Sequence, residues 1–191
     1  LFKKEGEEKV VGELEKEIYE TLGMSWIPPE LREARGEIEA AQNNELPELV
    51  ILDDIKGDLQ SHSDWSDGHN TILQVGKEAQ SMGYEYIAIT DHSQGLSVAG
   101  GLTKEDIKER EEELREAEEQ LDIHLLSGIE VDIKKDGTLD MDSGTLEDLD
   151  LVLGAVHSNF KMDRNDQMNR IKDAFSTGLI DIFAHPTGRM I

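Results

Sequence analysis

The sequence predicts an α/β fold in which a parallel sheet is covered by helices. Short runs such as 86–89 and 151–156 are apolar at successive positions, which is typical of strands that are buried on both faces. Amphipathic segments with helical spacing separate these runs. The runs recur at intervals of roughly 30 residues, the length of one βα unit. Both a barrel and an open doubly wound sheet are consistent with these observations.

The first 54 residues differ from the rest and predict a helical connector. Apolar residues recur at steps of three and four between 9 and 22, which predicts an amphipathic helix. Two consecutive prolines predict extended backbone over 26–32. A short acidic helix is expected at 36–45. The βα units then occupy 55–191.

Five strands and four helices are predicted in this second part. The strands are expected at 58–62, 84–92, 123–133, 150–157 and 181–185. The helices are expected at 71–82, 103–120, 143–148 and 164–175. The segment 103–120 is rich in glutamate and has a narrow apolar stripe at Ile107, Leu114 and Leu121. This pattern favours a helix with a solvated acidic face over one that binds a partner.

The charge balance excludes a protein that coats nucleic acid over its whole surface. The 191 residues include 43 acidic and 19 basic side chains, a formal net charge of −24. Phosphate backbones are bound by surplus lysine and arginine, which this chain lacks. Any contact with a polyanion must therefore be local.

The amino-acid composition also limits which cellular compartment and which kind of metal site can be expected. The chain has no cysteine, so disulfides and thiolate ligands are excluded and a cytoplasmic location is expected. The sequence shows no membrane-length apolar run and no signal-peptide pattern. Because the chain starts without methionine and stops just after a predicted strand, we expect it to be part of a longer protein.

Histidines and carboxylates stand at the carboxyl ends of the predicted strands. These residues are His62 with Asp67, Asp91 with His92, Glu130 with Asp132, His157 and His185. In a parallel sheet such ends converge on one edge, where ligands bind. One histidine in this place usually only makes hydrogen bonds, but four of the six histidines share it. Imidazole and carboxylate together indicate a site for zinc, manganese or iron.

Phosphoester hydrolysis is the reaction that best suits such a site. Clustered cations lower the pKa of a bound water and neutralise a phosphate together with its leaving oxygen. Lys161, Arg164 and Arg189 add basic charge after the fourth and fifth strands. Arg170, by contrast, is expected to be a cation on a helix surface.

Five motifs in order resemble those of the PHP (polymerase and histidinol phosphatase) family. They are Asp58 to Gly68, Ile89-Thr90-Asp91-His92-Ser93, Gly128 to Ile133, Val156-His157-Ser158 and Ala184 to Arg189. The Thr-Asp-His-Ser and His-Pro-Thr-Gly-Arg forms look most like the PHP domain of family X DNA polymerases. The stretch from Glu17 to Glu33 is similar to the end of a polymerase thumb and its connector.

The resemblance implies a distorted (β/α)7 TIM-like barrel, of which this chain holds about five units. It assigns 1–54 to the end of the thumb and a linker, and 55–191 to the PHP domain. It also implies up to three divalent ions, manganese or zinc with magnesium possible, and a manganese-stimulated 3'-5' exonuclease that acts on DNA 3' ends within a parent polymerase. No membrane partner is implied, and the oligomeric state is left open.

The resemblance also implies roles for individual residues. The metal-ligand positions are His62, Asp67, His92, Glu130, His157, His185 and, as a weak ligand, Gln60. Glu130 is the expected bridge between two ions, and Glu130, His62 and Arg189 are the expected catalytic residues. Asp91 and Asp132 are expected to support the ligands or to be structural groups, since a carboxylate often holds a ligating imidazole.

The chain departs from the family pattern in two places. Gln60 replaces the first histidine of the usual His-x-His motif, which loosens one metal position or shifts it toward manganese or magnesium. The final Asp-x-His of the family would lie beyond Ile191. We therefore expect an open barrel and a weak or inactive phosphoesterase in the chain alone.

Two alternatives remain at this point. The chain could be a free-standing PHP phosphatase for small substrates such as histidinol phosphate, although the thumb-like beginning opposes that. It could instead be a non-catalytic PHP scaffold, with Gln60 as a sign of decay.

Overall fold

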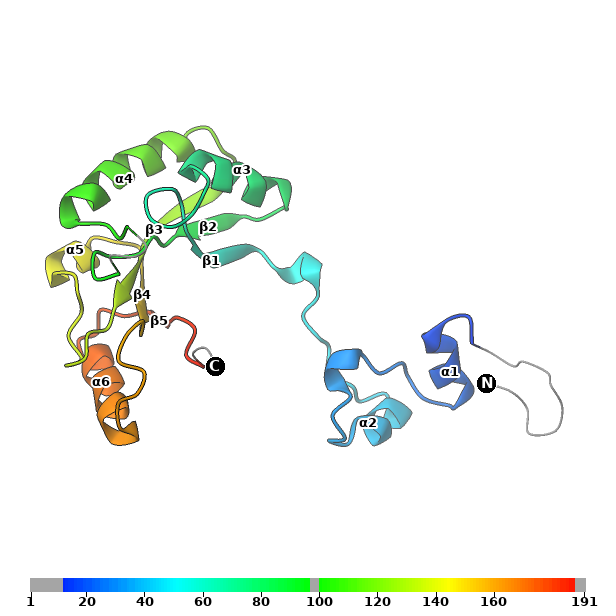
Figure 1. The fold of residues 1–191 in the computed structure, drawn as a ribbon. Helices are drawn as coiled ribbons and strands as arrows, with labels where there is room; N and C mark the ends of the chain where they lie inside the picture. Colours follow the sequence, from blue (N-terminus) through cyan, green and yellow to red (C-terminus); the bar gives the residue numbers. More distant parts are fainter. Residues whose placement is uncertain (1–11, 97–99, 188–191) are drawn as a thin grey trace. The chain divides into compact units, whose positions relative to one another are not determined.

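The structure is a computed structural model that describes residues 12–96 and 100–187 (Figure 1). The chain divides into two compact units, Leu1–Leu52 and Asp53–Ile191. Each unit is described by itself.

The first unit contains two short helices and one helical turn. Helix α1 spans Glu15–Thr21, the 3-10 turn η1 spans Pro29–Leu31 and helix α2 spans Glu37–Asn43. The prediction of extended backbone through both prolines is wrong for the second one. Pro28 is extended, with φ −54° and ψ 143°, but Pro29 starts η1. Proline suits a first helical position because its missing N–H has no partner there anyway.

Arg32 contacts several side chains in the described part of this unit. Its Nη1 and Nη2 atoms each donate to Glu15 at 2.8 Å. The guanidinium carbon lies 5.5 Å from the centre of the Tyr19 ring and 5.9 Å from that of Trp26. A planar cation that pairs with a carboxylate and stacks on aromatic rings cannot be replaced by lysine without loss.

The second unit is built on a parallel five-stranded sheet. The strands are β1 (Gly57–Ser61), β2 (Tyr86–Ile89), β3 (His124–Asp132), β4 (Leu151–Ala155) and β5 (Ile182–Phe183). They lie in the order β1-β2-β3-β4-β5, and every neighbouring pair is parallel. The sheet curls into a half-barrel (Figure 1). This confirms the predicted α/β fold and decides for the barrel over the doubly wound sheet.

The 3-10 turn η2 (Leu52–Asp54), which the sequence does not predict, precedes β1. The helices that connect the strands are α3 (Ile72–Ser81), α4 (Lys104–Glu118), α5 (Ser143–Glu147) and α6 (Arg164–Ser176), as predicted. Side-chain caps determine where α3 and α4 begin. Thr71 and Gln74 form a capping box at the start of α3, and Thr103 and Asp106 form one at the start of α4. A capping box provides partners for backbone N–H groups that the first turn leaves free.

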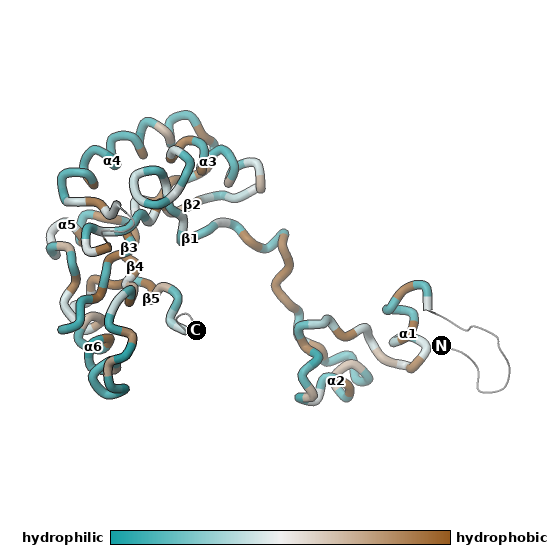
Figure 2. Tube along the Cα trace, in the orientation of Figure 1, coloured by the Kyte–Doolittle hydropathy of each residue, from teal (hydrophilic) through white to brown (hydrophobic). Residues whose placement is uncertain are grey.

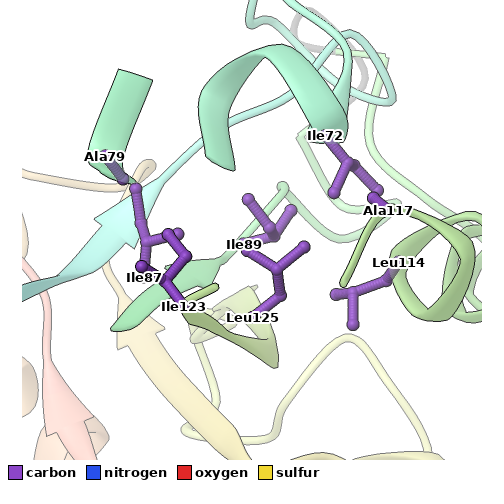
Figure 3. Close-up of a cluster of buried hydrophobic side chains, with 8 residues drawn as sticks. All are labelled: Ile72, Ala79, Ile87, Ile89, Leu114, Ala117, Ile123 and Leu125. Atoms are coloured by element: carbon purple, nitrogen blue, oxygen red, sulfur yellow. The ribbon is translucent and has the colours of Figure 1, made fainter. Parts of the chain in front are cut away.

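The larger apolar core lies where α3 and α4 pack on β2 and β3 (Figure 3). Ile72 from α3 and Ile89 from β2 are fully buried, and Leu114 from α4 is 4% exposed. Burial of each such side chain contributes about 2 kcal/mol. The remainder of α4 is mostly hydrophilic in Figure 2, as the glutamate-rich pattern predicts.

Two arginines of the covering helices are buried. Arg110 in α4 is 0% exposed and Arg170 in α6 is 2% exposed. The prediction that Arg170 is a helix-surface cation is therefore wrong, because its guanidinium turns inward to backbone carbonyls. Within residues 12–96 and 100–187, no helix is long and apolar enough to span a membrane.

Candidate metal centre

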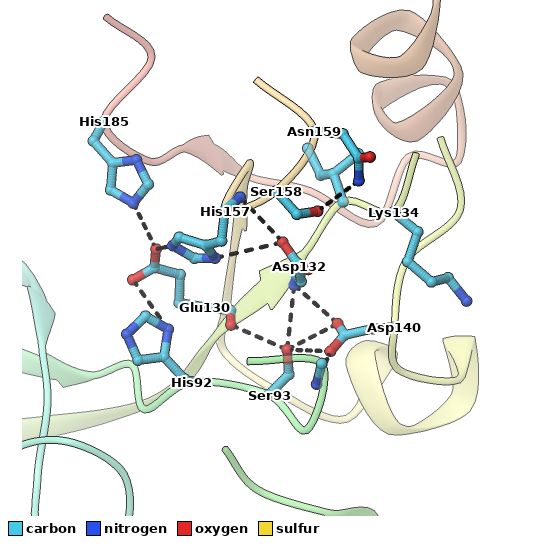
Figure 4. Close-up of polar contacts among 12 residues, drawn as sticks. His92, Ser93, Glu130, Asp132, Lys134, Asp140, His157, Ser158, Asn159 and His185 are labelled. Atoms are coloured by element: carbon cyan, nitrogen blue, oxygen red, sulfur yellow. Dashed lines mark hydrogen bonds and ion pairs between the residues drawn. The ribbon is translucent and has the colours of Figure 1, made fainter. Parts of the chain in front are cut away.

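Four imidazoles surround the carboxylate of Glu130, and Figure 4 shows three of them, those of His92, His157 and His185. Glu130 lies near the carboxyl end of β3, and its side chain is 1% exposed. Each histidine follows the end of a different strand, because the parallel strands all direct these ends to one edge of the half-barrel. The convergence expected from the sequence is thus present in the structure.

The two carboxylate oxygens face different imidazoles. Oε1 lies 2.8 Å from His185 Nε2 and 3.1 Å from His157 Nε2. Oε2 lies 3.4 Å from His62 Nε2 and 3.9 Å from His92 Nδ1. Glu130 therefore separates the four histidines into two pairs and is shared by both.

Asp67 lies beside the first pair. Its Oδ1 is 3.5 Å from His62 Nδ1, and its Oδ2 is 3.6 Å from His92 Nε2. The side chain is half exposed, at 51%. Asp67 thus faces the two imidazoles from the solvent side, opposite the buried Glu130.

Gln60, in β1, also reaches Glu130. Its amide nitrogen Nε2 donates to Glu130 Oε2 at 2.8 Å. The group that faces the carboxylate is therefore a donor and not the amide oxygen expected as a weak ligand. A carboxylate that accepts this N–H is held in place from the side of β1.

The two supporting aspartates have different partners. Asp132 Oδ1 lies 3.4 Å from His157 Nδ1 and accepts the backbone N–H of His157 at 3.3 Å, as expected of a group that orients an imidazole. Asp91 instead accepts hydrogen bonds from Ser63 and Ser66. Asp91 is thus a structural group, as one of the two expected roles has it, because its carboxylate holds the loop that follows β1 and not an imidazole.

A third supporting carboxylate, that of Asp140, is not predicted from the sequence. Asp140 accepts from Ser93 Oγ at 2.8 and 2.7 Å, from Gly95 N at 2.6 Å and from Asp132 N at 2.9 Å (Figure 4). It therefore ties the loop after His92 to the end of β3. Sequence spacing does not identify Asp140, because it lies in the irregular segment between β3 and α5.

The electrostatic environment alters the pKa values of several of these groups. Burial raises the pKa of Glu130, but hydrogen bonds with His157, His62 and His185 outweigh burial and leave the pKa far below its usual range. The Asp132 and Glu130 carboxylates raise the pKa of His157 to about 9. Burial lowers the pKa of His92, whereas for His62 the Glu130 carboxylate overcomes burial and raises the pKa.

The donor atoms fit divalent metal ions. Two groups each place three ligand atoms within 4.8 Å of one another: His62, His92 and Glu130, and Glu130, His157 and His185. In the described part of the chain, the Nδ1 atoms of His62 and His92 are buried without a hydrogen-bond partner. Imidazole nitrogen and carboxylate oxygen are ligands for zinc and for manganese or iron. Both groups of ligand atoms include Glu130.

The basic residues expected near the site are only partly described. Lys161 follows β4 and Arg164 begins α6, and both are exposed. Arg189 lies outside the described residues.

Comparison with known proteins gives matches in both units. The PHP domain profile matches residues 58–190, and the DNA polymerase beta thumb profile matches residues 1–33. A Bacillus subtilis (strain 168) protein named DNA polymerase/3'-5' exonuclease PolX is 42% identical over 178 residues, which are 93% of this chain and 31% of that protein. Two proteins named Probable phosphatase, from Thermoanaerobacter sp. (strain X514) and Thermoanaerobacter pseudethanolicus, are each 30% identical over 129 residues, which are 63% of this chain and 50% of theirs. The chain thus spans about a third of the first relative and half of the other two.

Proposed function

Since the chain belongs to the PHP domain family and is similar to the PHP domain of a family X DNA polymerase, we propose that the centre around Glu130 is a metal-dependent phosphoesterase that trims DNA 3' ends. The observation that carries this proposal is the position of Glu130. Its two oxygens face two separate imidazole pairs, at 2.8 to 3.9 Å. A carboxylate shared by two groups of ligands would hold two divalent ions close together, as in enzymes that hydrolyse phosphoesters with two metal ions.

The ligand roles follow from the two groups. His62, His92 and Glu130 would hold one ion, with Asp67 as a further ligand on the solvent side. Glu130, His157 and His185 would hold the other. Divalent ions in such sites activate water for attack and offset the charge of the phosphate and its leaving oxygen.

The residues of the chain supply orientation and charge. Asp132 directs the imidazole of His157 toward Glu130, and Gln60 holds Glu130 from β1. Glu130 stays ionised at neutral pH because of its lowered pKa, as a ligand must. The ions also explain how a chain with a net charge of −24 accepts a phosphate, since they place positive charge where the phosphate binds.

DNA 3' ends are proposed as the substrate on the evidence of the first unit and the first relative. Residues 1–33 match a polymerase thumb, and the Bacillus subtilis protein is named a DNA polymerase and 3'-5' exonuclease. In this proposal the first unit is the end of the thumb and its linker, and manganese is the stimulating ion. Arg189 is proposed to contact the phosphate, beyond the described residues.

The two relatives named as phosphatases support a second candidate, a phosphomonoesterase for small substrates. The match at residues 1–33 opposes a free-standing enzyme of that kind.

One experiment separates these activities. The intact protein is incubated with Mn²⁺ and a single-stranded oligonucleotide labelled at its 5' end, and in parallel with histidinol phosphate. A ladder of products shortened from the 3' end, absent with Glu130→Gln, supports the exonuclease. Faster release of phosphate from histidinol phosphate supports the phosphatase. If neither substrate is cleaved although Mn²⁺ is bound, the proposal fails and a scaffold remains.

A further inference from the structure

Arg110 and Arg170 are the largest of the fully buried side chains in the described chain. They come from α4 and α6, two of the helices that flank the sheet. A guanidinium cannot be buried without partners that compensate for lost hydration. The partners of each arginine therefore show which part of the molecule it holds in place.

Arg110 forms an ion pair with Asp91. Its Nη1 atom lies 3.8 Å from Asp91 Oδ2, and both side chains are 0% exposed. The Nη2 atom is 3.0 Å from Glu111 Oε1 and 3.5 Å from Ser127 Oγ. The positive charge of Arg110 thus compensates the buried Asp91 carboxylate, which directly precedes the ligand His92.

Asp91 in turn holds the loop that carries His62 and Asp67. Its carboxylate accepts the backbone N–H and the hydroxyl of Ser63, each at 2.7 Å, and the hydroxyl of Ser66 at 2.7 Å. Ser63 and Ser66 both lie between the two ligands. Three hydrogen bonds to one buried carboxylate therefore determine the path of this loop.

Arg170 contacts the segments near the other pair of imidazoles, on the opposite side of Glu130. It donates from Nε to Lys134 O at 3.0 Å and from Nη1 to Ser158 O at 2.8 Å, and it also donates to Ile133 O. Ser158 directly follows the ligand His157, and Ile133 follows Asp132, which orients His157. Arg170 thus joins the end of β3 to the start of the loop after β4.

We propose that each buried arginine positions one of the two ion sites. Arg110, through Asp91, sets the site of His62 and His92, and Arg170 sets the site of His157 and His185. The two networks share no partner in the contacts above, and the two sites share only Glu130 as a ligand. This inference rests on the proposed metal centre. It makes both arginines positioning residues, since neither touches an ion or a substrate.

The matched variants Arg110→Met and Arg170→Met test the proposal in the intact protein. Zn²⁺ is titrated in while the ring nitrogens of each histidine are followed by NMR, which assigns each bound ion to its imidazoles. Arg110→Met should weaken zinc binding at His62 and His92 by about 10- to 100-fold and change His157 and His185 less than threefold. Arg170→Met should do the reverse. Equal weakening at both sites, or none at either, would overturn the proposal.

Two further measurements cover the cases in which a variant does not fold or the wild type does not bind zinc. If Arg110→Met does not fold, the double variant Arg110→Met with Asp91→Asn removes both buried charges together, which is tolerated better than loss of one. The same selective loss at His62 and His92 is expected from it. If the wild type binds no zinc at these imidazoles, the proposed function fails. The positioning role is then judged in the metal-free protein by hydrogen exchange of the Ser63 amide, which must become faster in Arg110→Met and stay unchanged in Arg170→Met.

Discussion

The amide nitrogen of Gln60 lies 2.8 Å from Oε2 of Glu130 and donates a hydrogen bond to it. The usual PHP motif has a histidine in the place of Gln60, so the chain replaces an expected imidazole by a group that binds the central carboxylate. Glu130 is held from β1 by this contact even without an ion. The same contact occupies the oxygen that faces His62 and His92.

The variant Gln60→His should raise the affinity for zinc. An imidazole restores a nitrogen ligand beside His62 and removes the amide N–H that competes for Glu130 Oε2. The expected gain is about tenfold or more for zinc, and smaller for manganese, which prefers oxygen. Competition with a chromophoric chelator measures both affinities. An unchanged zinc affinity would mean that position 60 lies outside the ligand shell.

The variant Glu130→Gln should remove ion binding at both sites together. The amide cannot supply charge to either pair of imidazoles, so we expect a loss of more than about 100-fold in the affinity for Mn²⁺. Isothermal titration calorimetry measures the number of bound ions. Glu112→Gln makes the same chemical change at an exposed position of α4 and is expected to leave binding unchanged. Loss at one site alone would show that Glu130 is not shared.

The metal-free protein should lose stability as the pH rises from about 6.5 to 9. The pKa of His157 is about 9 in the folded protein and 6.5 for an ordinary imidazole, so the folded state retains the proton more strongly. The proton on His157 therefore contributes its full stabilisation below pH 6.5, and this stabilisation is lost as the pH rises through 9. It adds at most about 3 kcal/mol to the free energy of unfolding. His62, whose pKa is also raised, acts in the same direction.

Urea denaturation in the presence of a chelator measures this dependence. The lowered pKa of His92 affects stability only below pH 6.5, which is outside the range from 6.5 to 9. Below pH 6.5 it reduces the stability of the folded protein as the pH falls. His157→Asn should flatten the curve between pH 6.5 and 9. A wild-type curve that is already flat there would contradict the raised pKa.

The variant Gly68→Ala should disturb the loop between His62 and Asp67. A Cβ at Gly68 would collide with the backbone carbonyl oxygens of His62 and Ser63. We expect a loss of about 1–3 kcal/mol in the free energy of unfolding, because backbone atoms must move to relieve the collision. Gly144→Ala is the control, since its Cβ would meet only an oxygen of Asp142 at 3.4 Å. Equal effects of the two variants would contradict the prediction.

The sequence predicted the helices and strands well because their signals are local. Apolar runs at 86–89 and 151–156 became the buried strands β2 and β4, and the caps Thr71 and Thr103 start α3 and α4 within one residue of the predicted beginnings. The path through Pro28 and Pro29 was predicted less well. A proline restricts its own φ but is equally suited to extended backbone and to the first position of a helical turn.

The histidines at strand ends were found for the same local reason, since a parallel arrangement directs all carboxyl ends to one edge. The partners of Asp91, Asp140 and Arg170 were not found. Each of these side chains contacts residues from another element, and no periodicity in the chain records which element lies beside it.

By itself, the sequence determined the α/β units, the five strand ends and the ligand types that stand there, because these depend on spacing along the chain. Only the tertiary structure decided that Glu130 separates the imidazoles into two pairs, that Gln60 donates to it and that two arginines are buried behind the ligands. The physical reason is the curl of the sheet. It brings His62 and His185, which lie at opposite ends of the strand order, to opposite oxygens of one buried carboxylate.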